Sequence, residues 1–489
     1  MRKTNGYLVG MFRIATVLIF LSSLFADEPT RLELRAEEVP APVVHWFGIY
    51  VAKQKIGWLR EEIAPAKDAR IALTFKAFLQ LETDGNVVRF QVTERLVFDG
   101  RSPYRLYSAA LSEDMGQGVE KKSVVRTPKG FQASIHVGGE TTRELVQLDF
   151  TLADRLASSV WLGRGGRKVG DKLTVRSLDM SELKVLPETF VLESIQNSLV
   201  RGVRQTIYVG SLSNPDEGEL GKLRASESGD LISIAFGGSL EARREPEAIA
   251  KKLDAPIDMF AVMKVPVDKP LGDPSEISAL VLEATGPGVK ELRSGPRQSV
   301  VAGDNAETCV LKLGAAHGGA TKATPEEIRK ALEATREFPA KDKRILVLAK
   351  QVVGDATVPR AQAERLVTFV DQYIEDVYGP EYSNAVSVMR GKRGDCSAHA
   401  MLFVALARAV GIPAREVSGF IYLGDEDRGF GGHAWCEIVL DGDWVEVDPT
   451  WNEMAINPTH ISFRGIDGST KMLKATGNLS LRVVRIERR

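Results

Sequence analysis

Arg393-Gly394-Asp395-Cys396 stands shortly before the apolar run Ala400-Met401-Leu402-Phe403-Val404-Ala405-Leu406-Ala407, and this stretch decides the fold of the second half of the chain. The run ends near Gly411, and Pro413 follows, which is typical of a helix C-terminus. The stretch therefore predicts a buried helix with Cys396 in its first turn. Unpaired backbone N–H groups and the positive end of the helix dipole lie there, and both favour the thiolate form of a cysteine.

Two further blocks follow the cysteine in an order that suits thiol chemistry. They are His433-Ala434-Trp435-Cys436-Glu437 and Trp444-Val445-Glu446-Val447-Asp448-Pro449-Thr450. In a thiol–imidazole–carboxylate triad the imidazole takes the proton of the thiol, and the acid orients the imidazole. The candidate catalytic residues are therefore Cys396, His433 and Asp448.

These blocks, together with Ala405–Arg415, resemble the transglutaminase-like superfamily, a branch of the papain-like fold. The resemblance implies that Cys396 is the nucleophile, that His433 is the general base and that Asp448 orients the imidazole. It also implies an α+β core. The family includes amide-bond hydrolases, acyl-transferring transglutaminases and members of unknown activity, so the resemblance does not imply a substrate.

The turn between the histidine and the acid predicts how they meet. Asp441-Gly442 separates two strand-like segments and is a favoured pair for a two-residue type I′ hairpin. In that register Leu440 opposes Asp443, and Asp448 lies diagonally from His433 on the same sheet face, roughly 7–8 Å away at the backbone. An apolar set on the opposite face supports this register: Ala434, Cys436, Ile438, Val445 and Val447.

A zinc site is the rival interpretation of the same residues. Cys396, His399, His433 and Cys436 have the spacing of four zinc ligands. Positions i and i+3 share a face on a helix but point to opposite faces on a strand, so Cys436 should diverge from His433. We therefore expect neither a metal nor a cofactor, and His399 is interpreted as a histidine satisfied within the packing. The glycine-rich loop 424–432 is either a substrate gate or a solvated loop.

The composition indicates a folded protein of several domains. The chain has 489 residues, of which 44% are hydrophobic and 26% charged, and it is too long for one ordinary core. Its 64 Lys and Arg residues balance 65 Asp and Glu residues, and no basic run stands out, so we expect no nucleic-acid partner. Three cysteines are too few for a disulfide framework in a chain of this size.

The N-terminus predicts export. Basic residues up to Arg13 precede the short apolar stretch Ile14–Ala26, and Asp27-Glu28-Pro29 follows, so residues 1–26 have the pattern of a signal peptide. Leu24 lies where a small residue is preferred before a cleavage site, which keeps an N-terminal membrane anchor as the alternative. We expect an exported protein, periplasmic or extracellular.

The first half of the chain has the pattern of β-strands. Apolar residues recur at every second position from Ile71 to Leu81, which is the period of a half-buried strand. Asp84-Gly85-Asn86 predicts a turn into a second strand, and Pro128-Lys129-Gly130 joins another pair. We predict an antiparallel β domain over residues 43–250, formed as a curved sheet or an open barrel.

Helical signals begin at Thr324-Pro325-Glu326-Glu327, which has the capping-box arrangement. Asp342 can cap a second helix, and apolar positions between Leu366 and Val377 form one face of a third. Residues 324–489 are therefore predicted to be a transglutaminase-like α+β catalytic domain. The Pro- and Gly-punctuated residues 254–319 should add a small β segment or linker before it.

The favoured hypothesis is an exported cysteine-dependent enzyme that acts on amide bonds of a protein, peptide or cell-wall substrate through a thioester intermediate. Hydrolysis of the peptidase or amidase type is favoured over acyl transfer, because nothing indicates a site that excludes water while admitting a second substrate. The alternatives are a cross-linking transglutaminase and a non-catalytic envelope scaffold. The β-rich region could bind an envelope partner, position the substrate or only stabilise the fold; the sequence does not decide.

Overall fold

The computed structural model describes residues 32–51, 53–83, 86–114, 119–137, 139–200, 203–214, 218–236, 240–258, 262, 264–314, 322–377, 382, 384–463, 472 and 475–489. They fall into two compact units, and the sequence boundary lies after Met259. The expected signal segment, residues 1–26, lies outside the described residues. Within the described part of the chain, no helix is both long and apolar enough to cross a membrane.

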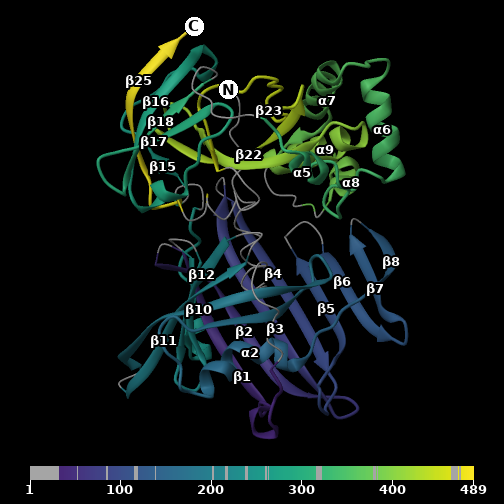
Figure 1. Ribbon diagram of the computed structural model, residues 1–489, viewed down its shortest axis with the longest axis vertical. Helices are drawn as coiled ribbons and strands as arrows, with labels where there is room; N and C mark the ends of the chain where they lie inside the picture. Colours follow the sequence, from purple (N-terminus) through teal and green to yellow (C-terminus); the bar gives the residue numbers. More distant parts are fainter. Residues whose placement is uncertain are drawn as a thin grey trace. The chain divides into compact units, whose positions relative to one another are not determined.

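The first unit is one antiparallel sheet of fourteen strands (Figure 1). Eight strands pair in chain order: β1 (Val43–Val51), β2 (Gln54–Ala66), β3 (Arg70–Thr83), β4 (Asn86–Phe98), β5 (Leu106–Asp114), β6 (Val119–Thr127), β7 (Gly130–Val137) and β8 (Glu140–Val146). After helix α2 (Leu152–Gly163), six more pair in chain order: β9 (Lys172–Asp179), β10 (Lys184–Val200), β11 (Val203–Asn214), β12 (Gly218–Ser226), β13 (Leu231–Phe236) and β14 (Leu240–Glu245). β14 pairs with β1, which joins the two halves into one sheet.

The predicted alternation in β3 is confirmed. Along this strand the inward positions are buried: Leu73, Phe75, Ala77, Leu79 and Leu81. Thr83 pairs with Asn86 across the predicted turn, and Thr127 pairs with Gly130 across the second one. The antiparallel β region of the sequence interpretation is therefore present, and its strands are fixed by period-two burial and short turns.

The sheet curves around helix α2. A capping box at Thr151 and Asp154 starts this helix. Trp161 of the helix meets the ring of Phe190 on β10, and the guanidinium of Arg155 lies 4.4 Å from the ring centre of Phe75 on β3. Since β3 and β10 belong to different halves of the sheet, one short helix can touch both only if the sheet bends around it. The sheet is therefore curved, in agreement with the expectation of a curved sheet or an open barrel.

Two carboxyl groups are enclosed within this unit. Glu94 on β4 and Glu188 on β10 are 2% and 3% exposed, respectively. Burial raises the pKa of Glu94 to about 8 and raises the pKa of Glu188 well above its usual value, although the nearby charge of Arg155 opposes both shifts. Protonation is the less costly state for an acid without water around it.

The second unit contains two main sheets. A four-stranded sheet has the order β17 (Gln298–Ala302), β18 (Thr308–Leu313), β16 (Ile277–Thr285) and β25 (Ser480–Arg488). A five-stranded sheet has the order β15 (Val265–Pro266), β22 (Gly429–Leu440), β21 (Ala414–Tyr422) and β24 (His460–Phe463), with β23 (Asp443–Val447) also paired to β22. The C-terminal strand β25 therefore pairs with a strand from residues 254–319, so distant parts of the sequence build one sheet.

Helices cover one face of the five-stranded sheet (Figure 1). They are α6 (Lys343–Val353), α7 (Pro359–Tyr373), α8 (Ala385–Gly391) and α9 (Cys396–Ala409), which share one apolar core with β22. The short helix α5 (Pro325–Lys330) packs against the opposite face, where Ile328 contacts the cluster of Val439 and Trp444. α9 packs against β21, β22 and the other long helices, and its residues from Cys396 to Ala407 are all buried. The chain is therefore multidomain, with a large antiparallel β region followed by an α+β core, as its sequence predicts.

The helix starts follow the sequence closely. Thr324 and Glu327 form the capping box of α5, and the Asp342 side chain caps α6. The third predicted helix differs at its end: α7 stops at Tyr373, so Val377 lies beyond it. The backbone at Glu375 and Asp376 instead forms β19, which pairs in parallel with β20 (Arg393–Gly394). This pairing joins the end of α7 to the segment before the cysteine helix.

Candidate active site

The start of α9 is held by its two preceding residues. The carboxylate of Asp395 accepts hydrogen bonds from the backbone N–H groups of Ser397, at 3.0 Å, and Ala398, at 3.4 Å. Gly394 has a φ of 154°, and a Cβ there would lie only 2.4 Å from the Cβ of Ala398. The Gly-Asp pair before the cysteine therefore has a local explanation: glycine leaves room for the first turn, and aspartate caps it.

Cys396 is the first residue of α9, as predicted, and it is 2% exposed. Its Sγ accepts a hydrogen bond from the backbone N–H of Ala434, with the two atoms 3.4 Å apart. The thiol thus lies beside the residue that follows His433. This contact connects the helix start with strand β22.

The electrostatic environment of the thiol differs from the sequence prediction. Burial raises the pKa of Cys396 well above its usual value, the charge of Asp395 raises it further, and the Ala434 N–H opposes the rise. Burial also raises the pKa of Asp395 itself to about 6, against the hydrogen bonds from Ala398 and Ser397. A helix N-terminus favours a thiolate, but desolvation outweighs that effect here. A neutral thiol needs a base to remove its proton.

The hairpin register is confirmed. Leu440 pairs with Asp443, and the turn residues Asp441 and Gly442 have φ angles of 53° and 83°. Positive φ at both positions is what a type I′ turn requires. The predicted apolar face also forms: Ala434, Cys436, Ile438 and Val447 are buried in the helix-facing core, and Val445 packs against it.

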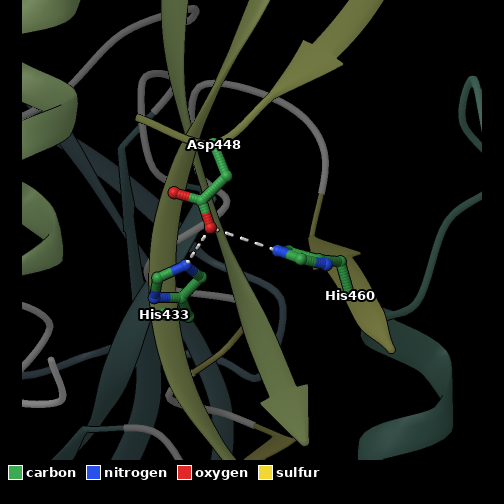
Figure 2. A group of neighbouring side chains, drawn as sticks. All are labelled: His433, Asp448 and His460. Carbon is green, nitrogen blue, oxygen red and sulfur yellow. Dashed lines mark hydrogen bonds and ion pairs between the residues drawn. The ribbon is translucent and has the colours of Figure 1, made fainter. Parts of the chain in front are cut away.

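This register brings Asp448 to His433. The Nε2 atom of His433 lies 2.8 Å from Oδ2 of Asp448, and the two residues are 5% and 0% exposed, respectively (Figure 2). The other carboxylate oxygen, Oδ1, accepts the backbone N–H of Thr450 at 2.8 Å, and the backbone of Asp448 bonds in both directions with Glu453. Burial acts to raise the pKa of Asp448, but the neighbouring imidazoles outweigh it and hold the pKa well below its usual value.

The ionised carboxylate of Asp448 can only accept a hydrogen bond, so Nε2 of His433 must carry the proton and donate it to Oδ2. The opposite ring nitrogen, Nδ1, is then the unprotonated one in a neutral imidazole. A group of this kind can remove a proton from a thiol.

Aromatic rings enclose the imidazole. Trp451 stacks on His433 with the ring centres 4.8 Å apart and an interplanar angle of 14°, and Trp435 lies 5.9 Å away at 24°. Gly419 on β21 makes room for Trp435, since a Cβ there would lie 2.3 Å from the indole ring. Packing of this kind fixes the imidazole plane and reduces the access of water to it.

His460 completes the group of polar side chains. Its Nε2 lies 3.3 Å from the same Oδ2 of Asp448 that His433 contacts (Figure 2). The donor atoms of His433, Asp448 and His460 lie within 4.8 Å of one another, so this set has the ligand types of a divalent-metal site. Hydrogen bonds account for the same arrangement.

The four residues of the rival zinc interpretation have separate contacts. His399 is buried and its Nδ1 lies 2.8 Å from the carbonyl oxygen of Asp395, so it is satisfied within the helix, as predicted. Cys436 faces the helices, where its Sγ lies 3.7 Å from the carbonyl oxygen of Ala400. Since His433 lies on the other side of β22, the two residues diverge as the strand period requires.

The loop before His433 is tied down by hydrogen bonds. Asp425 accepts from the Tyr422 hydroxyl and from the backbone N–H of Gly272, and Lys264 donates to the carbonyl of Asp427. Of the two sequence interpretations, a substrate gate and a solvated loop, these contacts favour the solvated loop, in which Asp425, Glu426 and Arg428 are exposed.

Three contributors to the site were not assigned a role from the sequence. They are Asp395, which caps the helix and raises the thiol pKa, Trp451, which stacks on the imidazole, and His460, which contacts Asp448. Trp451 directly follows the Asp448-Pro449-Thr450 block, so the sequence could have indicated that it lies near the site. The contact of His460 with Asp448 depends on the path of the chain between them.

Comparison with known proteins identifies the domain. Residues 347–449 match the sequence model of the Transglutaminase-like superfamily. No curated protein matches the chain. The match includes Cys396, His433 and Asp448, together with the helices and strands that carry them.

Several solved structures have some likeness to the chain. One, from Cytophaga hutchinsonii, is described as a candidate cysteine protease. Its sequence is 14% identical, the match covers 44% of this chain and 86% of that chain, and the TM-score is 0.27. A β-barrel-like protein of unknown function from Brucella abortus is 9% identical; the match covers 42% of this chain and 95% of that chain, with a TM-score of 0.31. A candidate protease from Parabacteroides distasonis is 9% identical; the match covers 78% of this chain and 70% of that chain, with a TM-score of 0.19.

These TM-scores are low, so the assignment rests on the family match and on its agreement with the observed helix, hairpin and side-chain geometry. Residues 347–449 of this chain form a domain of the transglutaminase-like superfamily.

Proposed function

We propose that this protein is an exported cysteine-dependent enzyme that hydrolyses amide bonds, with Cys396 as nucleophile, His433 as general base and acid, and Asp448 as the residue that orients His433. The hydrogen bond between His433 Nε2 and Asp448 Oδ2, at 2.8 Å, carries the proposal. It leaves Nδ1 as the basic nitrogen, on a strand whose next residue contacts the Cys396 sulfur.

The proposed reaction follows from the protonation states of these groups. The thiol is neutral at rest, because burial raises its pKa. His433 takes the proton as sulfur attacks the amide carbon, and the imidazolium then gives that proton to the leaving amine. A thioester remains on Cys396. Water, deprotonated by His433, attacks the thioester and releases the acid and the free thiol.

The backbone N–H of Cys396 lies at the helix start and is suited to donate to the oxyanion that forms during the attack. Protein, peptide and cell-wall amides are all suitable substrates for this chemistry. Export is proposed from the sequence pattern of residues 1–26. N-terminal sequencing of the protein secreted or retained by its host would test that part.

Hydrolysis is tested by incubating the full-length protein with a peptide library and with peptidoglycan fragments, with and without a primary amine. New carboxyl ends detected by mass spectrometry are the expected result. Amine adducts formed in place of new carboxyl ends would show acyl transfer instead.

The matched controls are Cys396→Ala and Cys309→Ala. Cys309 is another buried thiol, on β18, and burial raises its pKa to about 11. Loss of turnover in Cys396→Ala but not in Cys309→Ala is expected. Equal turnover in both variants would reject the proposal.

A further inference from the structure

An open cavity lies at one end of the antiparallel sheet in the first unit. Neighbouring strands there run in opposite directions, so three segments meet at the same end of the sheet: residues 68–70, where β2 turns into β3, residues 99–105 between β4 and β5, and the end of β6. These segments line a cavity of about 610 Å³. Small-molecule sites have volumes of about 300–1,000 Å³, so this cavity has room for a small ligand.

A glycine brings the first two segments together. A Cβ at Gly100 would lie 1.6 Å from the backbone carbonyl oxygen of Ala69, so a larger residue there would force the backbone apart. In the facing turn, Asp68 and Ala69 have φ angles of 57° and 54°, in the left-handed region that residues with a Cβ rarely adopt. The wall of the cavity is therefore held by a defined backbone geometry.

Four arginines line the cavity, and two of them are fixed by neighbouring side chains. The guanidinium of Arg126 on β6 donates to both carboxylate oxygens of Asp99, at 2.9 and 2.8 Å, and to the first backbone carbonyl of β5 at 3.1 Å. The guanidinium of Arg70 donates to Asp68 at 3.0 Å and lies 3.5 Å from the ring centre of Tyr107. Both side chains are partly buried, so their charges are held in place at the cavity wall.

The other two arginines of the lining are Arg101 and Arg105. Both are exposed, and neither has a carboxylate partner within the part of the chain that the structure describes. The acidic groups of the lining are Asp68 and Asp99, so four guanidinium groups face two carboxylates and the cavity has an excess of two positive charges. Like charges held this close together repel one another, and an anion bound between them removes that repulsion.

We propose that this cavity binds a phosphate monoester, with Arg101 and Arg105 as its principal contacts. The planar guanidinium fork matches the oxygens of a phosphate group. A phosphate monoester carries about −1.5 to −2 charges at about pH 7, which balances the excess positive charge of the cavity. The Ser102 hydroxyl and the Asp68 carboxylate can hydrogen-bond hydroxyl groups of the same ligand, so a phosphorylated polyol suits the lining better than inorganic phosphate. This role for the β-rich region goes beyond the proposed amide hydrolysis.

The test is calorimetric titration of the full-length protein with glycerol 3-phosphate, and sedimentation of the protein with lipid vesicles that contain phosphatidic acid. Saturable binding of either probe is expected, several-fold weaker when sodium chloride is raised from about 20 to about 150 mM, because salt screens exposed charges. Binding of the first probe identifies a soluble ligand, and binding of the vesicles identifies a lipid headgroup. Inorganic phosphate and succinate should bind less tightly. Binding of neither probe, or equally tight binding of succinate, would overturn the proposal.

The double variant Arg101→Gln/Arg105→Gln removes both unpaired charges and should weaken binding of the probe by at least about tenfold. Both side chains are exposed, so the fold should be kept, and thermal unfolding checks this. The matched control is Arg95→Gln/Arg224→Gln, which removes two exposed arginines of β4 and β12 outside the cavity lining and should leave binding unchanged. Equal binding by the two double variants would refute the site. These measurements need no catalytic activity, so they stand apart from the proposed reaction.

Asp68→Asn tests the charge argument with the opposite sign. Asparagine tolerates the positive φ of this turn, and its side-chain oxygen still accepts hydrogen bonds. The Asp68 side chain is 76% exposed, so the substitution should keep the fold. Loss of its negative charge increases the positive excess of the cavity, and the probe should bind about two- to fivefold more tightly at low salt. A damaged fold does not strengthen binding, so tighter binding would support the site, and weaker binding would contradict it.

Discussion

Replacing Asp395 by asparagine should make the thiol of Cys396 more acidic while leaving the helix start intact. The carboxylate caps α9 through two backbone N–H groups, and an asparagine oxygen can accept the same bonds. Asp395 also raises the thiol pKa through its negative charge. At an effective dielectric constant of about 20, unit charges roughly 6–8 Å apart interact by about 2–3 kcal/mol. The thiol pKa should therefore fall by about 1–2 units in the variant.

The pH at which this difference appears is set by Asp395 itself. Its pKa is about 6, raised by burial from an ordinary value of 3.8. Below that pH the carboxyl is protonated, and the variant should behave like the original protein. Above it, the original protein carries the charge and the variant does not. Iodoacetamide should then alkylate Cys396 about 3- to 10-fold faster in the variant at about pH 8, since a lower pKa also makes the thiolate a weaker nucleophile.

The same shift has a consequence for stability. A carboxyl whose pKa is higher in the folded protein than in the unfolded chain stabilises the fold while protonated, and this contribution is lost as the pH rises through about 6. Relative to the original protein, Asp395→Asn should therefore gain up to about 3 kcal/mol as the pH rises from about 4 to about 7. Asp395→Ala also removes the charge but loses the cap, which costs about 1 kcal/mol.

Alkylation is read by mass spectrometry at Cys396, and unfolding by chemical denaturation at several pH values. Equal alkylation rates for Asp395→Asn and the original protein at about pH 8, or slower alkylation in the variant, would refute the electrostatic argument. A variant that is faster at about pH 5 as well would show that the cap had been disturbed and not only the charge.

Three further predictions follow from buried groups. Asp448→Asn should keep the fold by circular dichroism but lower kcat by about 10³- to 10⁴-fold, because His433 loses the partner that fixes its tautomer; activity within tenfold of the original would exclude this role. Glu94→Gln should raise the melting temperature at about pH 9 but not at about pH 5, because the stabilisation from protonated Glu94 is lost as the pH rises through about 8; equal effects at both pH values would contradict it. A thiol-reactive substrate mimic should label Cys396 before Cys436: burial raises the pKa of both thiols, but Cys436 faces the helices, away from His433, so it has no base to take its proton; the opposite order would contradict the strand assignment.

Local patterns in the sequence predicted the elements that carry the site. Capping residues such as Asp342 mark helix starts because their side chains bond to N–H groups only two or three residues away. The hairpin register followed from Asp441-Gly442 because a two-residue turn leaves only one way to pair its strands. These interactions are short-range, so the sequence alone was enough to predict them.

The diagonal contact between His433 and Asp448 was also predictable, because one hairpin contains nearly all of the chain between them. The same reasoning could not reach His460. Its approach to Asp448 depends on how Glu453 and Asn457 fold the intervening segment back, and those bonds follow no regular period. The pairing of β25 with β16 is of the same kind, since nothing local indicates which strands separated by most of a domain will pair.

The sequence by itself determined the order of Cys396, His433 and Asp448, the helix start that holds the thiol and the strand face that holds the other two. Only the tertiary structure decided their electrostatics. The helix start was expected to favour a thiolate, but the thiol pKa is raised because packing around α9 removes water from the sulfur. Desolvation depends on every chain segment that covers a group, and a sequence pattern describes only the segment to which the group belongs.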